Sequence, residues 1–169
     1  SEVSFENVKL LSSSLLGEEN KAYALIELVT DETIAALCAE AIGAMSVLNE
    51  TTVEYCKTRK QFGQPIGKFQ VLQHRMVDMF MQYEQSVSMT YMVNLKLKEE
   101  DLERSKAASG AKVQICNAAK FIGQSAVQLH GGMGMTDELN VGHYFKRLSM
   151  IETQLGNADH HLKKYSLAS

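Results

Sequence analysis

The sequence is nearly free of proline and has no tryptophan, since Pro65 is its only proline among 169 residues. Proline interrupts helices because it lacks a backbone N–H and clashes with the preceding turn. A chain so poor in proline can therefore hold long, unbroken helices. No apolar run approaches the ~20 residues that a membrane-spanning helix needs. The first residues lack the basic stretch followed by an apolar one that is typical of a signal peptide.

The chain also lacks a basic surplus, because 17 Lys and Arg face 20 Asp and Glu, for a net charge of −3. A protein that binds the nucleic acid backbone needs such a surplus, so this class is excluded. Cys38, Cys56 and Cys116 are too scattered for a disulfide framework or a CxxC metal site. Reduced thiols are typical of the cytosol, so we predict a cytoplasmic protein. The length and the hydrophobic fraction of 45% predict one domain, or part of a larger protein, with a sizeable core.

Residues 1–28 differ from the rest of the chain. Val3, Phe5 and Val8 suggest alternation, a serine-rich stretch at 12–17 is typical of a loop, and residues 23–26 form a short apolar patch. We interpret this segment as one or two strands followed by a connector. Because a small piece of sheet is not stable alone, we expect the segment to be the end of another domain.

From about Thr30 the apolar pattern becomes helical. Apolar residues recur at spacings of three and four from Ile34 to Leu48, which predicts an amphipathic helix to about Lys57, capped by Thr30 or Asp31. Further helices are predicted over 68–96, 102–129, 140–150 and 157–167. Gly110 and Gly123 lie inside the third of these five helices, where we expect close helix packing. Three long helices and a divided fourth predict an all-α, up-and-down four-helix bundle over residues 29–169.

Two loops between the predicted helices carry unusual residues. The loop at 59–67 contains Arg59, suited to bidentate phosphate recognition, Gln61 with amide donors, and Phe62 with a flat apolar face. The loop at 128–134 has three glycines in four residues, which lets the backbone approach a ligand closely. Taken singly, each loop could be an ordinary corner between helices. No Glu-x-x-His motif is present, and adjacent histidines at 160 and 161 point about 100° apart on a helix, so we predict no metal site.

Taken together, the two loops resemble the acyl-CoA dehydrogenase family. The motifs are Tyr-x-x-x-Arg-x-Gln-Phe-Gly-x-Pro-Ile at 55–66 and Gln-Leu-His-Gly-Gly-Met-Gly at 128–134. Val-Ser-Phe-Glu-Asn-Val at 3–8 and Leu-Gly at 16–17 are similar to the last strands of the family's middle β domain. The resemblance implies that residues 1–28 end that domain and 29–169 form the C-terminal helical bundle. An N-terminal helical domain and most of the β domain would then lie outside this chain.

The resemblance also implies an activity and a set of partners. Members of the family hold FAD and desaturate acyl-CoA thioesters between the α and β carbons, with an electron-transfer flavoprotein as partner. They assemble as a dimer of dimers, in which the first loop reaches the FAD of a neighbouring subunit. On this sequence, Arg59 should meet the FAD pyrophosphate. The residues implied to line the adenine and ribose side are Gln61, Phe62, Ile66, Phe69 and Gln70, the last of which could equally be a packing residue. Gln128, Gly131 and Gly132 should contact the same cofactor, and Asn157 and Asp159 should contact its flavin end.

The family's catalytic base is missing from both of its expected positions. These positions fall at Leu155 and Thr33, and neither side chain can take up a proton. Glu152 and Glu32 are the nearest acids, but each would need a shift in register, and they can be read simply as a surface or salt-bridged acid and a helix-start acid. We therefore predict no catalytic residue among these 169 residues. We also expect them to be inactive alone, because the resemblance implies that most of the FAD and thioester site lies in the domains outside this chain.

The run at 154–162 resembles a subgroup acting on bulky or dicarboxylic acyl-CoA, including the small subunit of pimeloyl-CoA dehydrogenase. Some chains of that subgroup pair with another chain that carries the base. Three interpretations stay open: an acyl-CoA dehydrogenase, a non-catalytic subunit that clamps FAD in a hetero-oligomer, and an acyl-CoA oxidase or flavin monooxygenase on the same fold.

Overall fold

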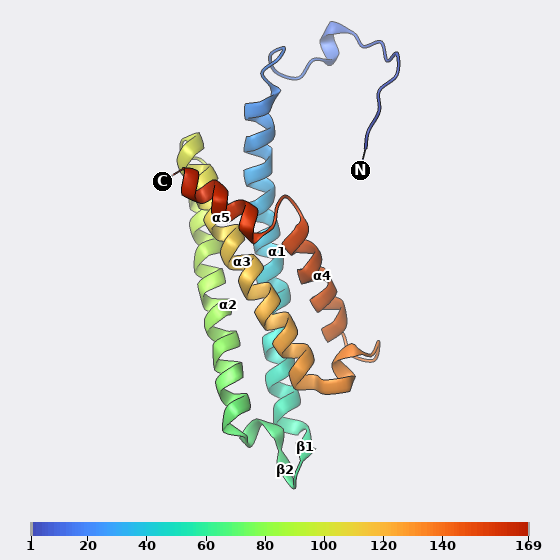
Figure 1. Ribbon diagram of the computed structural model, residues 1–169, viewed down its shortest axis with the longest axis vertical. Coiled ribbons are helices and arrows are strands. Elements are labelled where there is room, and N and C mark those ends of the chain that lie inside the picture. Colours follow the sequence, from blue (N-terminus) through green and yellow to red (C-terminus); the bar gives the residue numbers. More distant parts are fainter. Residues whose placement is uncertain (1, 169) are drawn as a thin grey trace.

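The computed structural model describes residues 2–168, and its helices form a bundle (Figure 1). The long helices are α1 (Ala22–Thr58), α2 (Gln70–Lys96) and α3 (Asp101–His130), followed by the shorter α4 (Val141–Thr153) and α5 (Ala158–Leu167). Strands β1 (Lys60–Gln61) and β2 (Gln64–Pro65) form a small antiparallel hairpin. Short 3₁₀ turns lie at Ser12–Ser14, Ile66–Lys68 and Gly131–Met135. The predicted all-α bundle with a divided fourth helix is confirmed. Within the described residues, no helix combines the length and the apolar character needed to cross a membrane.

Helix α3 is the centre of the bundle and packs against each of the other helices. Its buried face is rich in alanine, which lets the neighbouring helices approach closely. Gly123 shows why a still smaller residue is needed at one point. A Cβ on Gly123 would lie 2.7 Å from Cδ2 of Phe145 in α4, closer than two carbon atoms approach without displacement. The expected close packing at this glycine is confirmed.

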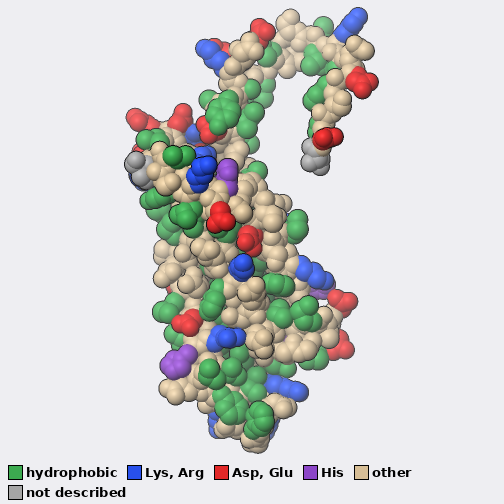
Figure 2. Space-filling view, viewed as in Figure 1, with side chains coloured by type: hydrophobic (Ala, Val, Ile, Leu, Met, Phe, Trp, Pro, Cys, Tyr) green, Lys and Arg blue, Asp and Glu red, His purple; other side chains and the backbone are tan. Residues whose placement is uncertain are grey.

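The N-terminal segment differs from the prediction. Residues 2–21 contain no strand, and the apolar patch at 23–26 belongs to α1, which begins at Ala22 rather than near Thr30. A strand needs a partner strand, and none is available here: the side chains of Val3 and Phe5 are 73% and 80% exposed. The first turns of α1 extend beyond the bundle, and Figure 2 shows hydrophobic side chains along the N-terminal segment. Because these turns have no buried face, the burial pattern could not reveal where the helix begins.

Asp31 has a different role from the predicted one of a helix cap. It lies inside α1, is fully buried, and forms ion pairs with Arg104 of α3 at 3.3 Å and Lys164 of α5 at 3.9 Å. Burial raises the pKa of the Asp31 carboxyl, and the two cations oppose that rise. This acid therefore joins three helices rather than the start of one.

Candidate functional site

The two unusual loops meet at one cavity of about 450 Å³. The end of α1 and the end of α3 lie at the same end of the bundle, which brings together motifs that are far apart in the chain (Figure 1). The cavity is lined by Tyr55, Arg59, Gln61 and Ile66 from the first motif and by Gln128, Leu129, His130, Gly131, Gly132 and Met133 from the second. Six of the predicted cofactor residues therefore face one space.

The hairpin holds Arg59 and Gln61 at this cavity. The Arg59 N–H donates to the Tyr55 carbonyl at 2.8 Å and ends α1, while the Ile66 N–H donates to the Arg59 carbonyl at 2.8 Å. Strand β1 then pairs with β2, with Lys60 opposite Pro65. The backbone of Arg59 is thus fixed on both sides, and only its long side chain is free to adjust to a ligand.

Arg59 is an exposed cation that forms no ion pair with any described carboxylate. An arginine without a carboxylate partner keeps its planar set of N–H donors available for an anion. In the second motif, Gly131 has φ +61°, which favours glycine, and its N–H donates to the Gln128 carbonyl. A Cβ on Gly131 or Gly132 would meet nothing within 4 Å, so open space lies directly beside this backbone.

Tyr55 and His130 connect the two loops and were not predicted as site residues. Their rings lie 4.4 Å apart between centroids, and the Tyr55 hydroxyl donates to the His130 carbonyl at 3.4 Å. His130 is 3% exposed, and its Nδ1–H donates to the Ala126 carbonyl at 2.8 Å. Both residues stand inside the motifs of the sequence. Their mutual contact could not be foreseen, because it spans two loops that meet only in the folded chain.

Five predicted cofactor residues do not line the cavity. Phe62 lies at the hairpin tip, 90% exposed, with its ring edge-on to Phe69 at 6.1 Å between centroids, and Gln70 is the exposed first residue of α2. Asn157 caps α5 by accepting from the His160 N–H at 3.0 Å, and Asp159 is exposed in the first turn of that helix. The α4–α5 turn lies away from the hairpin end of the bundle (Figure 1), so the structure does not bring these two residues to the cavity. Their roles stay predictions.

The two base positions hold no proton acceptor in the folded chain either. Leu155 lies in the α4–α5 turn with φ +56° and is 42% exposed. Thr33 is exposed, and its hydroxyl donates to the Val29 carbonyl at 2.6 Å. Glu32 is exposed on α1, and Glu152 is half-buried near the end of α4. Neither acid is placed at the position of the residue that it would have to replace.

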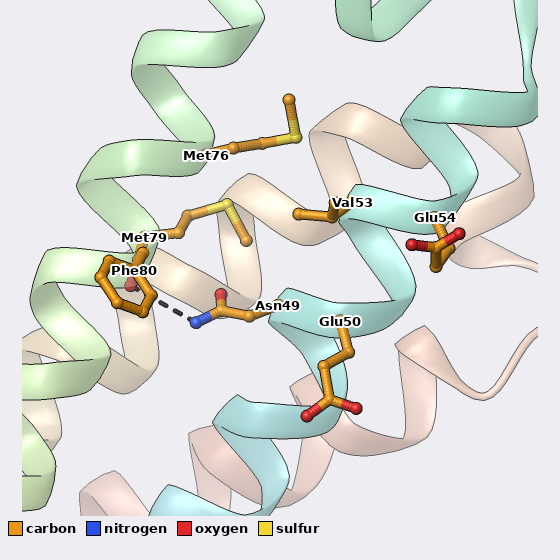
Figure 3. A pocket seen from close by; sticks show the side chains of 7 residues that line it. All are labelled: Asn49, Glu50, Val53, Glu54, Met76, Met79 and Phe80. Atoms are coloured by element: carbon orange, nitrogen blue, oxygen red, sulfur yellow. Dashed lines mark hydrogen bonds between the residues drawn. The ribbon is translucent and has the colours of Figure 1, made fainter.

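A second cavity, of about 400 Å³, lies between α1 and α2 and contains none of the predicted site residues. Figure 3 shows Val53 and Asn49 of α1 pointing toward α2, and Met76 and Met79 of α2 pointing toward α1. The Asn49 side-chain N–H donates to the Met79 carbonyl at 3.5 Å. The groove is largely apolar and has no cluster of donors or cations, so it lacks the chemistry of a nucleotide site.

His161, in the turn near Leu155, predicts a pH-dependent stability. It is 1% exposed, and burial lowers its pKa from 6.5 to about 4, with His160, Lys112 and Lys164 acting in the same direction. Above pH 6.5 the His161 side chain is neutral in both the folded and the unfolded chain. As the pH falls from 6.5 to 4 the unfolded chain takes up a proton that the folded chain does not, so stability falls by up to about 3 kcal/mol.

The measurement is urea unfolding of the full-length protein between pH 7 and pH 4. His161→Gln should flatten the decline, since glutamine does not titrate, whereas His74→Ala, at an exposed histidine of α2, should leave it unchanged. Equal slopes in wild type and His161→Gln would contradict the assignment.

Comparison with known proteins agrees with this geometry. Residues 27–164 match the family described as "Acyl-CoA dehydrogenase, C-terminal domain". The short-chain specific acyl-CoA dehydrogenase of Megasphaera elsdenii is 30% identical over 155 residues, which cover 92% of this chain and 40% of that protein. The acyl-CoA dehydrogenase IpdE2 of Mycolicibacterium smegmatis is 35% identical over 136 residues, covering 80% of this chain and 42% of that protein.

A solved structure shows the same fold. The butyryl-CoA dehydrogenase of Megasphaera elsdenii superimposes with a TM-score of 0.88 at 28% identity, covering 97% of this chain and 43% of that one. The chain thus spans about two fifths of the length of the relatives it matches. The helical bundle, the two motifs and the family match over residues 27–164 agree. The chain therefore belongs to the acyl-CoA dehydrogenase family and contains its C-terminal helical domain.

Proposed function

We propose that this domain is part of an FAD-dependent acyl-CoA dehydrogenase, to which it contributes cofactor contacts and an assembly surface. The observation that carries the proposal is the single cavity formed by Arg59 and the glycine loop. Desaturation removes a proton from the α carbon and a hydride from the β carbon of the thioester. FAD supplies the hydride acceptor when it is bound, and the protein supplies placement and electrostatics.

The residues at the cavity fit a dinucleotide. The pyrophosphate of FAD carries two negative charges. The guanidinium of Arg59, which has no ion pair among residues 2–168, can bind it through parallel N–H bonds. The side-chain amides of Gln61 and Gln128, which line the same cavity, add donors. The side-chain-free backbone of Gly131 and Gly132 allows close approach. These groups bind and orient the pyrophosphate, and none of them moves a proton. The other parts of FAD, including the flavin end assigned to Asn157 and Asp159, would extend beyond this cavity.

The α-proton requires a carboxylate that neither base position supplies. Because Leu155 and Thr33 cannot accept a proton, we propose that a partner chain carries the base, in a hetero-oligomer of the kind found in the pimeloyl-CoA dehydrogenase-like subgroup. The second candidate function is a non-catalytic subunit that binds FAD. The absence of a proton acceptor at Leu155 and Thr33 favours this candidate as well. An electron-transfer flavoprotein is the proposed electron acceptor, and an oxidase on the same fold would use oxygen instead.

Self-association is proposed through the outer face of α2. Phe80 lines the groove of Figure 3 and is 56% exposed, and further along α2 the side chains of Tyr91 and Leu95 are 68% and 80% exposed. Large apolar side chains exposed on one helix are typical of an interface. Phe80→Glu should weaken self-association of the full-length protein at least about tenfold, because a carboxylate would be buried at the contact.

Sedimentation velocity across a concentration series measures this change. Val71→Glu is the matched control, since Val71 is nine residues earlier on α2 and therefore on its opposite side. An unchanged association constant in Phe80→Glu would exclude this face.

The test of the proposed function uses the full-length protein loaded with FAD without oxygen, to which short-, medium- and long-chain acyl-CoA thioesters are added. Bleaching of the flavin absorbance by any thioester would support a dehydrogenase that has its own base. Bound flavin that stays oxidised until a partner chain is added would support the hetero-oligomer. Failure to bind FAD would contradict the proposal, and rapid oxygen consumption would favour the oxidase.

A further inference from the structure

Tyr55 contacts the backbone of both motifs at the cavity. Its carbonyl accepts a hydrogen bond from the Arg59 N–H at 2.8 Å, and its hydroxyl donates to the His130 carbonyl at 3.4 Å. Tyr55 lies in the last turn of α1, whereas His130 is the last residue of α3, 75 positions further along the chain. One residue therefore links the backbone that carries the Arg59 guanidinium to the backbone that leads into the glycine loop.

The Tyr55 hydroxyl also holds the peptide group at the start of the glycine loop. The His130 carbonyl and the Gly131 N–H belong to one peptide group, which is planar. Its oxygen accepts from Tyr55, and its N–H donates to the Gln128 carbonyl. Gly131 then has φ +61° and ψ −142°, a conformation that is populated almost only by glycine. The direction in which the loop leaves α3 thus depends on a peptide group that is held at both its oxygen and its nitrogen.

The imidazole ring of His130 keeps Tyr55 in place. His130 is 3% exposed, and its Nδ1–H donates to the Ala126 carbonyl at 2.8 Å, which fixes the orientation of the ring. The Tyr55 ring packs against it at 4.4 Å between centroids, with 31° between the ring planes. Rotation of the tyrosine away from the His130 carbonyl would break this packed contact.

This link lies at the proposed cofactor cavity itself. Tyr55 and His130 both line the cavity of about 450 Å³, together with Arg59 and Gly131. A ligand that contacts both motifs binds more tightly when their relative placement is set in advance, because ordering a loop during binding lowers the affinity. The pyrophosphate of FAD, with Arg59 on one motif and the glycine backbone on the other, is such a ligand.

We propose that Tyr55 and His130 are positioning residues, which set the placement of the Arg59 guanidinium relative to the backbone of Gly131 and Gly132 before FAD binds. This inference rests on the proposed function, because FAD is the ligand that it assumes. Tyr55 acts through the two backbones to which it is hydrogen-bonded, and His130 acts through Tyr55.

The first test is Tyr55→Phe in the full-length apoprotein, titrated with FAD. The variant keeps the ring and removes only the hydroxyl, so the affinity for FAD should fall about three- to tenfold, as expected for one lost hydrogen bond. Amide hydrogen exchange over 131–135, measured without FAD, should rise in the same variant. Tyr83→Phe is the matched control, since Tyr83 is a half-buried tyrosine of α2 that packs against the core and does not line the cavity. It should change neither quantity.

A double-mutant cycle distinguishes positioning from a purely structural role. In protein that already carries Arg59→Met, the effect of Tyr55→Phe on FAD affinity should shrink to less than about twofold, because the placement of the two motifs no longer matters once one of them has lost its contact. His130→Ala removes the packed ring and should lower FAD affinity about three- to tenfold. His130→Phe keeps a ring against Tyr55 and should restore most of that loss.

The remaining outcomes contradict the inference in different ways. Unchanged FAD affinity in Tyr55→Phe would overturn it, even if hydrogen exchange over 131–135 rises, because the contact would then serve the fold alone. Independent, multiplying effects of Tyr55→Phe and Arg59→Met would also overturn it. If His130→Ala does not fold, the cycle of Tyr55→Phe with Arg59→Met decides. Wild-type protein that binds no FAD would contradict the proposed function itself, which separates that failure from a failure of the positioning role.

Discussion

Replacing Arg59 with methionine should weaken FAD binding by the full-length protein about ten- to a hundredfold. The guanidinium has no competing carboxylate among the described residues, so its hydrogen bonds are free for a pyrophosphate. A hydrogen bond to a charged group contributes about 1.5–3 kcal/mol, which corresponds to that range. Methionine keeps most of the length of the side chain and removes the charge, so the change isolates the electrostatic contribution.

The affinity for FAD is measured by titrating the apoprotein with FAD and following flavin fluorescence. Lys60→Met is the matched control, because Lys60 is the next residue along, is also an exposed cation, and does not line the cavity. Its FAD affinity should stay within about twofold of wild type, as expected for a surface charge. Similar losses in both variants would mean that the site responds only to general positive charge, and no loss in Arg59→Met would remove the pyrophosphate assignment.

Leu155→Glu should give the full-length protein a thioester-dependent bleaching of its flavin at least about a hundredfold faster than wild type. The resemblance places the family's base at this position, and a correctly placed general base contributes about 10²–10⁴-fold. The turn is favourable for such a gain, since the Leu155 carbonyl is already bound to His161 and the side chain is exposed. A new carboxylate therefore needs no buried space.

Anaerobic stopped-flow absorbance measures the rate of flavin bleaching. The Leu155→Gln variant is the control that distinguishes proton abstraction from the effect of side-chain size. Glutamine matches glutamate in size and cannot take up the proton, so it should leave the rate at the wild-type level. Equal acceleration by both variants would show that polarity rather than a base is responsible. Rapid bleaching already in wild type would mean that the base is elsewhere in this chain, with Glu152 and Glu32 as the residues to change next.

The interior helices were predictable from the local order of residues, and the two motifs were identified by their resemblance to a known family. Apolar spacing located the interior helices, because each is buried along one face and that face repeats with the helical period. The predicted start of α1 was wrong because its first turns extend beyond the bundle and bury no face, so they carry no repeating apolar pattern. The strand pattern of Val3, Phe5 and Val8 failed because a strand depends on a partner that the described chain does not provide.

Contacts between distant segments could not be deduced in this way. The sequence shows Arg59 and the glycine loop as two separate corners, and their common cavity depends on α1 and α3 ending at the same end of the bundle. Asp31 reads as a helix-start acid but is buried against Arg104. No local pattern indicates that Lys112 caps the end of α4 from the core. The helical period and the residue preferences of turns involve only a few neighbouring residues, so the local sequence is sufficient to predict them. Burial and hydrogen-bond partners are properties of packed neighbours, which only the folded chain brings together.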